Sequence, residues 1–281
     1  MIARLVAGLL LLAAPIVPAR AQDALSVMSF NVRLPLASDG PDAWEQRRDL
    51  FVATIAREAP DIIGTQELWA IQGNYVVDRL PRYAWFGIDR RGGHADEHMG
   101  IFYRRDRLKL IDRGDFWLSD TPSVPGSISW GNLYPRMVSW GRFETLKGRR
   151  RFLVYNTHFP YRDEDGPARD KAAAALLARI GPDTGEPVIL TGDFNTGPDS
   201  NPHAQLTRTL SDAWTGAARR SGPEGSFHGF TGKPGRRIDW ILTRGFAVRD
   251  IRTVTTHRGA RYPSDHFPVV ARFDWQAAAR N

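Results

Sequence analysis

An apolar run that ends in polar residues reads Val188-Ile189-Leu190-Thr191-Gly192-Asp193-Phe194-Asn195. Its first three residues predict a buried strand, because branched apolar side chains pack well on a pleated sheet. With a side-chain period of two, Asp193 and Asn195 face the same way while Phe194 points into the core. Gly192 allows a sharp turn or the close approach of a ligand. The run therefore predicts a carboxylate and an amide presented together at the mouth of a buried strand.

The same pattern recurs at four further places along the chain. The polar residues that end or interrupt those apolar runs are Glu67, His158, Asp239, Asp265 and His266. Taken singly, each is as consistent with a structural hydrogen bond or a capped turn as with a functional site. A buried acid needs a partner, however, since an unpaired buried charge costs several kcal/mol. Five such segments, all carrying oxygen or imidazole donors, predict one shared site.

Strands and helices alternate along the rest of the chain. Strands are predicted at residues 26–32, 100–103, 137–143, 151–157, 187–191, 237–242 and 268–273. Helices are predicted over 44–58, over 168–180, and from a cap at Asn201 to about Leu210. This mixture favours layered sheets covered by helices, but it leaves the topology open. No repeat or linker divides residues 22–281, which we treat as one domain.

The N-terminal segment resembles an export signal. Arg4 precedes an apolar run over residues 5–17 that is too short to span a bilayer, and Ala19-Arg20-Ala21 fits a signal-peptidase site. We therefore expect a signal peptide over 1–21, cleaved after Ala21, and a secreted or periplasmic protein. A short membrane anchor is the alternative, and the polar Gln22-Asp23 that follows argues against it. No later segment is long and apolar enough to cross a membrane.

Composition narrows the possible chemistry. The chain has 281 residues, of which 42% are hydrophobic and 25% charged, as in an ordinary globular protein. The absence of cysteine excludes disulfides, thiolate metal sites and a lipoprotein anchor. The net charge is +7, and removal of Arg4 and Arg20 leaves +5. This charge suits an anionic substrate, but an ordinary basic surface explains it equally well.

Six motifs, in this order, are similar to those of the endonuclease/exonuclease/phosphatase superfamily, which includes deoxyribonuclease I, sphingomyelinases, inositol-polyphosphate 5-phosphatases and deadenylases. They are Phe30-Asn31-Val32, Gln66-Glu67, Asn156-Thr157-His158, Gly192-Asp193-Phe194-Asn195, Arg237-Ile238-Asp239 and Ser264-Asp265-His266-Phe267-Pro268-Val269. The similarity extends over residues 25–273. Residues 116–127 resemble an uncharacterised exported bacterial branch nearest the deadenylase/nocturnin-like group.

The resemblance implies a fold, an activity and a set of site residues. The implied fold is of the α/β (α+β) class, a DNase I-like four-layer α/β/β/α sandwich with two packed mixed β-sheets. The implied activity is Mg²⁺-dependent hydrolysis of phosphate esters, with Mn²⁺ as a substitute, by in-line attack of a metal-assisted water. The implied metal ligands are Glu67, Asp265 and Asn31, the implied catalytic residues are His158, Asp193, Asn195, Asp239 and His266, and the implied substrate-binding residues are Arg136 and Asn31.

Each catalytic residue takes a role from the same resemblance. Asp193 and Asn195 would orient the attacking water and the phosphate, and His158 would donate to a non-bridging phosphate oxygen. Asp239 would hold His266 in one tautomer. Whether Asp193 or His266 accepts the proton of the water stays open.

Arg33 departs from the pattern of several nuclease members, which have an acid at this position. A second metal ligand is therefore missing there, and we expect one Mg²⁺ rather than two. Arg33 either touches the substrate phosphate or is a solvated strand residue, and the second interpretation is slightly favoured.

The sequence leaves the substrate open. A nuclease or phosphodiesterase, of which a 3′–5′ exonuclease is one form, is the first expectation, with a phosphate ester such as nucleic acid as partner and a monomeric chain. A phosphomonoesterase for sugar, inositol or lipid phosphates is the alternative, and residues 129–134 are the one apolar loop suited to a lipid. An inactive binding module is a third hypothesis, which the complete set of site residues disfavours.

Two loops have no settled role. Residues 94–98 contain His94, Asp96, Glu97 and His98, but their spacing fits no compact metal motif, so a polar loop is the default interpretation. Glu97 and His98 would still be able to face the active site. Residues 227–230 are a lesser candidate for a substrate loop.

Overall fold

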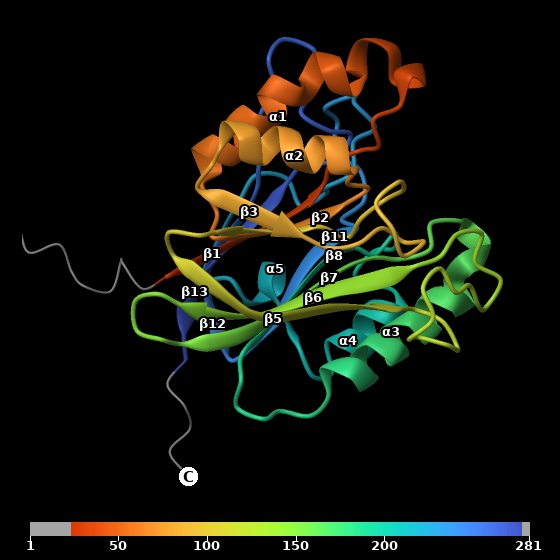
Figure 1. Ribbon diagram of the computed structural model, residues 1–281, viewed down its shortest axis with the longest axis vertical. Helices are drawn as coiled ribbons and strands as arrows, with labels where there is room; N and C mark the ends of the chain where they lie inside the picture. The colour runs from red at the N-terminus through yellow and green to blue at the C-terminus, as the bar shows by residue number, and fades with distance from the viewer. Residues whose placement is uncertain (1–23, 277–281) are drawn as a thin grey trace, which may run out of the picture.

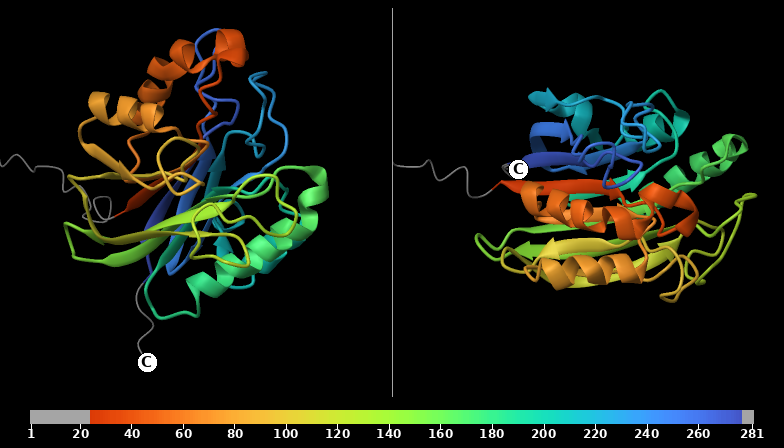
Figure 2. Two further views of the ribbon diagram at one scale, coloured as in Figure 1. Left: turned by 45° about the vertical axis from the view of Figure 1, so that its right-hand side comes forward. Right: turned by 90° about the horizontal axis from the view of Figure 1, so that it is seen from above.

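The computed structural model describes residues 24–276, so the expected signal peptide and its cleavage after Ala21 lie outside the described residues. Two β-sheets pack face to face, with α1 (Trp44–Glu58) and α2 (Ala70–Arg79) on one outer side and α3 (Gly166–Ile180) and α4 (Asn201–Leu206) on the other (Figure 1). The same layers can be followed in the turned view at the left of Figure 2. This arrangement confirms the expected α/β/β/α sandwich. Within residues 24–276, none of the helices combines the length and the apolar character needed to span a bilayer.

Both sheets mix parallel and antiparallel strands. The first sheet has seven strands in the order β10 (Arg219–Ser221), β12 (Phe246–Thr253), β13 (Val269–Trp275), β1 (Leu25–Asn31), β2 (Ile62–Gln66), β4 (Ile101–Arg104) and β3 (Tyr83–Phe86). The second has six strands in the order β5 (Leu108–Trp117), β6 (Met137–Thr145), β7 (Arg151–His158), β8 (Val188–Asp193), β11 (Asp239–Arg244) and β9 (Ser211–Asp212). Short helices η2 (Ala37–Asp42), η3 (Asp163–Asp165) and α5 (Ala213–Gly216) complete the described elements.

Three apolar clusters hold the four layers together. The central cluster fills the space between the sheets and contains Val27 and Ile62 of one sheet and Phe152 and Ile189 of the other. A second cluster buries α3 against the six-stranded sheet, and a third buries α1 against the seven-stranded sheet. β1 lies in one sheet and β8 in the other, and each is covered on both faces. Almost all of their residues are therefore buried. This burial on both faces explains the long apolar runs in the sequence.

The strand directions bring the polar ends of several strands to one edge. β1 runs parallel to β2, and Asn31 pairs with Gln66 at their last residues. β7 runs parallel to β8, and His158 pairs with Asp193 in the same way. β11 is antiparallel to β8 and begins opposite Asp193. The carboxyl ends of both parallel pairs therefore meet at one edge of the sandwich.

A buried polar contact joins the two sheets beneath this edge. The side-chain amide of Gln66 donates to Asn156 Oδ1 at 2.7 Å, and Asn156 Nδ2 donates to the carbonyl oxygen of Thr65 at 2.6 Å. The backbones approach so closely that a Cβ atom on Gly64 would lie 2.0 Å from Thr191 Oγ1. Gly64 is therefore required by the spacing of the sheets.

Most predicted elements are found, but one helix has different ends and some elements were not predicted. The helix expected to begin with a cap at Asn201 and to reach about Leu210 is wrong at both ends, because Ser200 is the N-cap residue and α4 stops at Leu206. Two long strands, β5 and β12, and the helix α2 were not predicted. All three are half-exposed and carry charged or polar residues that dilute the apolar pattern.

Candidate active site

Glu67 follows β2 in a left-handed backbone conformation, with φ of 59°. This conformation is costly for a residue other than glycine and is typical of functional sites. It directs the carboxylate toward the end of β1, where Glu67 Oε1 accepts from Asn31 Nδ2 at 3.0 Å and Oε2 accepts from the backbone N–H of Leu34 at 3.1 Å. Two donors thus fix the orientation of the carboxylate.

Asp193 Oδ2 lies at the centre of the polar edge. It accepts from Asn31 Nδ2 at 3.0 Å and lies 3.6 Å from His158 Nε2 and 3.7 Å from His266 Nε2. Burial, followed by the charge of Asp239, raises the pKa of the Asp193 carboxyl. Burial and the nearby Arg136 and His266 cations lower the pKa of His158 well below its usual value, so this imidazole is neutral.

Asn195 reaches the same site by a turn and not by the strand pleat that the sequence predicted. β8 ends at Asp193, and Asn195 has a φ of 53°. Its backbone N–H donates to Asp193 Oδ1 at 2.9 Å, and its side-chain amide donates to the carbonyl oxygen of Phe159 at 3.1 Å. Phe194 is buried against Trp240, as the alternation predicted. Asp193 therefore both faces the site and caps the turn that positions Asn195.

Asp239 and His266 form a buried hydrogen-bonded pair. His266 Nδ1 donates to Asp239 Oδ2 at 2.8 Å, because a carboxylate can only accept, and this bond leaves Nε2 facing Asp193. Burial alone would lower the pKa of His266, but the charge and hydrogen bond of Asp239 outweigh it and raise the pKa well above its usual value. The backbone N–H of Asp239 donates to Ser226 Oγ at 3.1 Å, which anchors the acid.

The predicted site residues surround one pocket of about 450 Å³. Seven of them line it: Glu67, Arg136, His158, Asp193, Asn195, Asp265 and His266. The other two, Asn31 and Asp239, are buried behind the wall and act through Asp193 and His266. The guanidinium of Arg136 is buried beside Tyr161, with 5.9 Å from its central carbon to the ring centre. The fold thus brings together residues that are far apart in the sequence; Asn31 and His266 are separated by 235 positions.

The donor set fits a hard divalent cation. Glu67 and Asp265 both face the pocket, and burial, together with the charge of Glu67, raises the pKa of the Asp265 carboxyl. A cation between the two carboxylates would relieve that repulsion, and Mg²⁺ prefers such oxygen ligands. Asn31 turns its Nδ2 toward Glu67 and Asp193, while its Oδ1 accepts from the backbone N–H of Arg33 at 3.0 Å. This amide therefore orients the carboxylates.

A second group of atoms also has metal-binding geometry. One ligand atom each from Asp193, Asp239 and His266 lie within 4.8 Å of one another. We favour the carboxylates of Glu67 and Asp265 as the metal ligands, because His266 Nδ1 is already committed to Asp239 and imidazole is a poor ligand for Mg²⁺.

Glu97 lines this pocket, as one of the two interpretations of its loop allowed, although a polar connection was the default. Its Oε1 accepts from Arg90 Nη1 at 2.7 Å, and its Oε2 lies 3.8 Å from His158 Nδ1. Burial, followed by repulsion from Glu67, raises the pKa of the Glu97 carboxyl. The sequence signal was weak, because Glu97 follows no apolar run and its neighbours are charged.

The histidines of the same loop do not join a metal cluster with Asp96 and Glu97. His98 Nδ1 donates to the carbonyl oxygen of Leu68 at 3.0 Å, and His94 Nδ1 lies 3.1 Å from His98 Nε2. Asp96 instead pairs with Arg90 at 3.0 Å. These contacts fix the loop against the residue that follows Glu67.

Arg33 lines the pocket, and so do Tyr134 and Phe227 from the two loops that were candidates for substrate binding. Arg33 is not the solvated strand residue that was favoured, because it lies beyond β1 with φ of 58° and donates two hydrogen bonds to Asp39, at 3.0 and 2.8 Å. Its Nη1 is 3.9 Å from Asp265 Oδ2. Phe227 packs edge-on against His266 with 5.0 Å between ring centres, and Tyr134 ends the loop 129–134 at the pocket.

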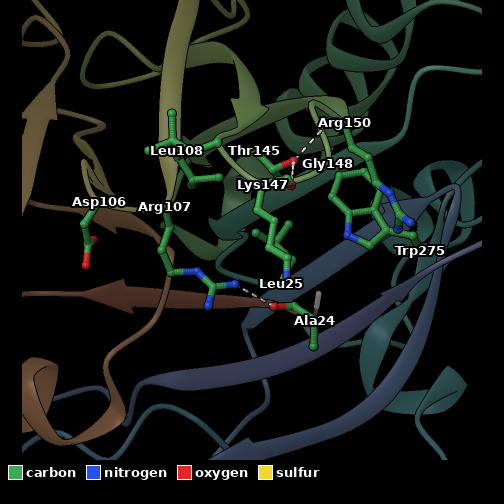
Figure 3. A pocket seen from close by; sticks show the side chains of 11 residues that line it. Ala24, Leu25, Asp106, Arg107, Leu108, Thr145, Lys147, Gly148, Arg150 and Trp275 are labelled. Atoms are coloured by element: carbon green, nitrogen blue, oxygen red, sulfur yellow. Dashed lines mark hydrogen bonds between the residues drawn. The ribbon is translucent and has the colours of Figure 1, made fainter. Parts of the chain in front are cut away.

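A pocket of about 340 Å³ lies at the opposite end of β1. Figure 3 shows Lys147 and Arg150, from the turn between β6 and β7, and Trp275 of β13 around it. Arg107 on its wall is already paired with Asp61 at 2.8 Å. None of the predicted site residues lines this pocket.

Comparison with known proteins agrees with this geometry. Residues 28–266 match the model of the Endonuclease/Exonuclease/phosphatase family. An endonuclease/exonuclease/phosphatase family protein of Bacteroides thetaiotaomicron is 31% identical, with a TM-score of 0.85, over 90% of this chain and 98% of its own. A mannosyl-6-phosphatase of Bacteroides thetaiotaomicron VPI-5482 is 32% identical, with a TM-score of 0.83, over 89% and 100%.

The human Nocturnin catalytic domain shares the fold, with a TM-score of 0.71 and 20% identity over 93% of this chain and 100% of its own. Aligned segments cover only 59% and 46% of the length of two curated relatives, so the chain spans about half of those proteins. The family match, together with two packed sheets that carry an acid–imidazole edge, places the chain among metal-dependent hydrolases of phosphate ester bonds. The chain belongs to the Endonuclease/Exonuclease/phosphatase family.

Proposed function

We propose that this chain hydrolyses the phosphate monoester of a small polar alcohol with Mg²⁺ as its cofactor. The carrying observation is the pocket of about 450 Å³, in which the buried Arg136 accompanies the acids and imidazoles of the site. A pocket of this size suits a small ligand. The similarity to a mannosyl-6-phosphatase over its full length supports a monoester substrate.

The protein's own groups would bind and orient the phosphate. Glu67 and Asp265 would hold the metal, which supplies positive charge against the phosphate oxygens. Arg136 and the neutral His158 would donate to non-bridging oxygens as negative charge develops on them. Asn195 and Asp193 would orient a water in line with the leaving oxygen. Asp193 Oδ2 would accept the proton of that water, because His266, 3.7 Å away and with a raised pKa, already carries a proton on both ring nitrogens.

A nuclease or phosphodiesterase, which was the first expectation from the sequence, becomes the second candidate. Three aromatic side chains at the pocket, Tyr134, Tyr161 and Phe227, offer surfaces on which nucleotide bases can stack. Tyr161 and Phe227 are exposed. The basic net charge of +7 is also compatible with a polyanion.

A substrate panel separates the two candidates. Purified protein would be assayed with Mg²⁺ on p-nitrophenyl phosphate, sugar phosphates, bis(p-nitrophenyl) phosphate and single-stranded oligonucleotides. We expect higher kcat/KM for the monoesters. Turnover of the oligonucleotides and the diester alone would replace the monoesterase proposal with the nuclease.

We also propose export through cleavage after Ala21. The support is the positive, apolar and small-residue order of the first 21 residues. Expression of the full chain in a bacterium, followed by fractionation and N-terminal sequencing, should give a periplasmic or secreted protein that begins at Gln22. An uncleaved chain in the cytoplasm would contradict export.

A further inference from the structure

Arg47 of α1 is completely buried, with an exposed fraction of 0%, and its guanidinium joins two segments that lead to the site. Nη1 donates to the carbonyl oxygens of Val32 at 2.7 Å and Pro263 at 2.9 Å, and Nη2 donates to that of Arg33 at 2.9 Å. Its two further hydrogen bonds also go to backbone carbonyl oxygens. Arginine is seldom buried to this extent, so five hydrogen bonds to the main chain require an explanation.

The first of these segments orients the Glu67 carboxylate. The carbonyl of Arg33 and the N–H of Leu34 belong to one planar peptide group, so a contact that fixes the carbonyl also fixes the direction of the N–H. That N–H donates to Glu67 Oε2 at 3.1 Å. Gln72 of α2, which lies beside α1 (Figure 1) and is also 0% exposed, donates from Nε2 to the same carbonyl oxygen at 2.9 Å. Arg47 and Gln72 together therefore hold the peptide that directs this acid.

The second segment carries Asp265. Pro263, whose carbonyl oxygen Arg47 holds, stands two residues before this acid. The hydroxyl of the intervening Ser264 donates to the carbonyl oxygen of Asn31 at 2.7 Å. The segment is thus tied to the end of β1 at two points, which fix the position of Asp265 relative to the carboxylate that follows β2.

The charge of Arg47 and its geometry would act on a bound metal in opposite directions. Burial lowers the pKa of Arg47 to about 10, so the guanidinium remains a cation at neutral pH. A cation behind the acids repels Mg²⁺, so its charge alone would weaken metal binding. Its hydrogen bonds, in contrast, are spread over two nitrogens of a planar fork, which the single ammonium nitrogen of lysine cannot reproduce.

We propose that Arg47, with Gln72, is a positioning residue that sets the separation of Glu67 and Asp265 for a divalent cation. The inference rests on the proposed Mg²⁺ cofactor. It adds that the geometry of the two acids is determined in the helical layer, through backbone peptides, and not only by the strands that the acids follow.

Binding of Mg²⁺ in the absence of substrate tests this inference. Isothermal titration calorimetry would give the Kd of Mg²⁺ for the wild-type chain, Arg47→Lys and Gln72→Leu. Lysine keeps the charge but not the fork, so we expect Kd to rise by about tenfold in Arg47→Lys. Gln72→Leu leaves Arg47 in place and should raise Kd by about threefold or more.

Arg169→Lys is the matched control. Arg169 is a buried arginine of α3, against the other sheet, and it also donates to backbone carbonyl oxygens, those of Pro160 at 2.9 Å and Arg162 at 2.8 Å. Neither of the two acids lies in the segment that it holds. Urea denaturation without metal should show a loss of stability in this variant as in Arg47→Lys, whereas its Kd for Mg²⁺ should equal that of the wild-type chain.

An unchanged Kd in Arg47→Lys, or in Gln72→Leu should the first variant fail to fold, would overturn the inference. An equal rise of Kd in Arg169→Lys would also overturn it, because weaker binding would then follow from a general loss of stability. If the wild-type chain itself binds no Mg²⁺, the proposed cofactor is wrong and the inference is overturned with it.

Discussion

Three residues at the site, Arg33, Glu67 and Asn195, hold left-handed backbone conformations that residues other than glycine seldom adopt. Each stands just beyond a strand and turns its side chain to the shared pocket. Such strain persists only when surrounding contacts determine it, and the hydrogen bonds of Asn31, Leu34 and Asp193 supply those contacts. The chain therefore gives up some stability where it positions its polar groups.

At the same scale, Asp239→Asn tests the acid–imidazole pair. The amide keeps the shape of the acid but can present N–H to His266 Nδ1 and favour the wrong tautomer. We expect kcat to fall by about 10² to 10⁴-fold, with little change in Tm. Asp274→Asn is the control, because Asp274 pairs with Arg249 at the far end of the fold. Near-normal kcat, or loss through unfolding alone, would make Asp239 a structural acid.

The sequence was informative about residues that follow apolar runs and silent about those that do not. Asp193, His158 and Glu67 were found because a buried strand leads to each of them. Glu97 was named only as an alternative to a plain polar loop, because its position depends on Arg90 and on a loop whose course the sequence pattern does not encode. The left-handed turn at Asn195 was missed for a similar reason, since it depends on a hydrogen bond to Asp193.

At the scale of elements, long buried strands were predictable and half-exposed ones were not. β8 is buried at all six positions, whereas β5 alternates irregularly between buried and exposed residues at the edge of its sheet. Edge strands tolerate charges, as in Asp112 and Arg113 of β5, and so lose the pattern that identifies a strand. The order of strands in each sheet depends on packing between distant segments and was not encoded in any local pattern.

Gly64→Ala tests the spacing of the two sheets. A methyl group there would lie within 3 Å of Thr191 and Asn156, which are short side chains fixed by the network between the sheets. We expect the free energy of unfolding to fall by about 1–3 kcal/mol, as for other overpacked cores. In Gly166→Ala, where the structure leaves open space, the change should stay under about 1 kcal/mol. Urea denaturation measures both, and equal effects would show that the sheets can move apart.

The loop that carries Glu97 should depend on the charge of Asp89. Asp89 accepts backbone N–H bonds from Arg91, Gly93, Ala95 and Asp96 at 2.6–3.0 Å. Burial would raise its pKa, but these bonds outweigh burial and lower the pKa below the usual value. The stabilisation is therefore complete above the unfolded pKa of about 4 and is lost as pH falls through the lower folded value.

Hydrogen exchange, expressed as protection factors for the amides of residues 91–96, would follow this loss. Protection should be constant from neutral pH down to about 4 and should then decline. Asp89→Asn should reduce protection at neutral pH and remove the acid-dependent step. Protection that is independent of pH in the wild-type chain would contradict the role of Asp89.

At the scale of the whole molecule, the packing of the four layers brings the ends of two parallel strand pairs to one edge. β1 and β2 from one sheet and β7 and β8 from the other end together there, and the segment just before β13 adds Asp265 and His266. Each sheet supplies only part of the set, so neither sheet alone contains the site. The local patterns did not determine which strands are neighbours. The family resemblance, by contrast, predicted that these strand ends converge.

If Glu67 and Asp265 hold a catalytic metal, the hydrolysis of phosphate esters must depend on that metal. Protein depleted of metal by a chelator would be assayed on p-nitrophenyl phosphate while Mg²⁺ is added back, beside Glu67→Gln. We expect no turnover without metal and saturable recovery with Mg²⁺, and we expect Glu67→Gln to need at least about tenfold more Mg²⁺ for the same recovery. Turnover that survives exhaustive chelation, at the rate of the metal-loaded protein, would contradict this metal dependence.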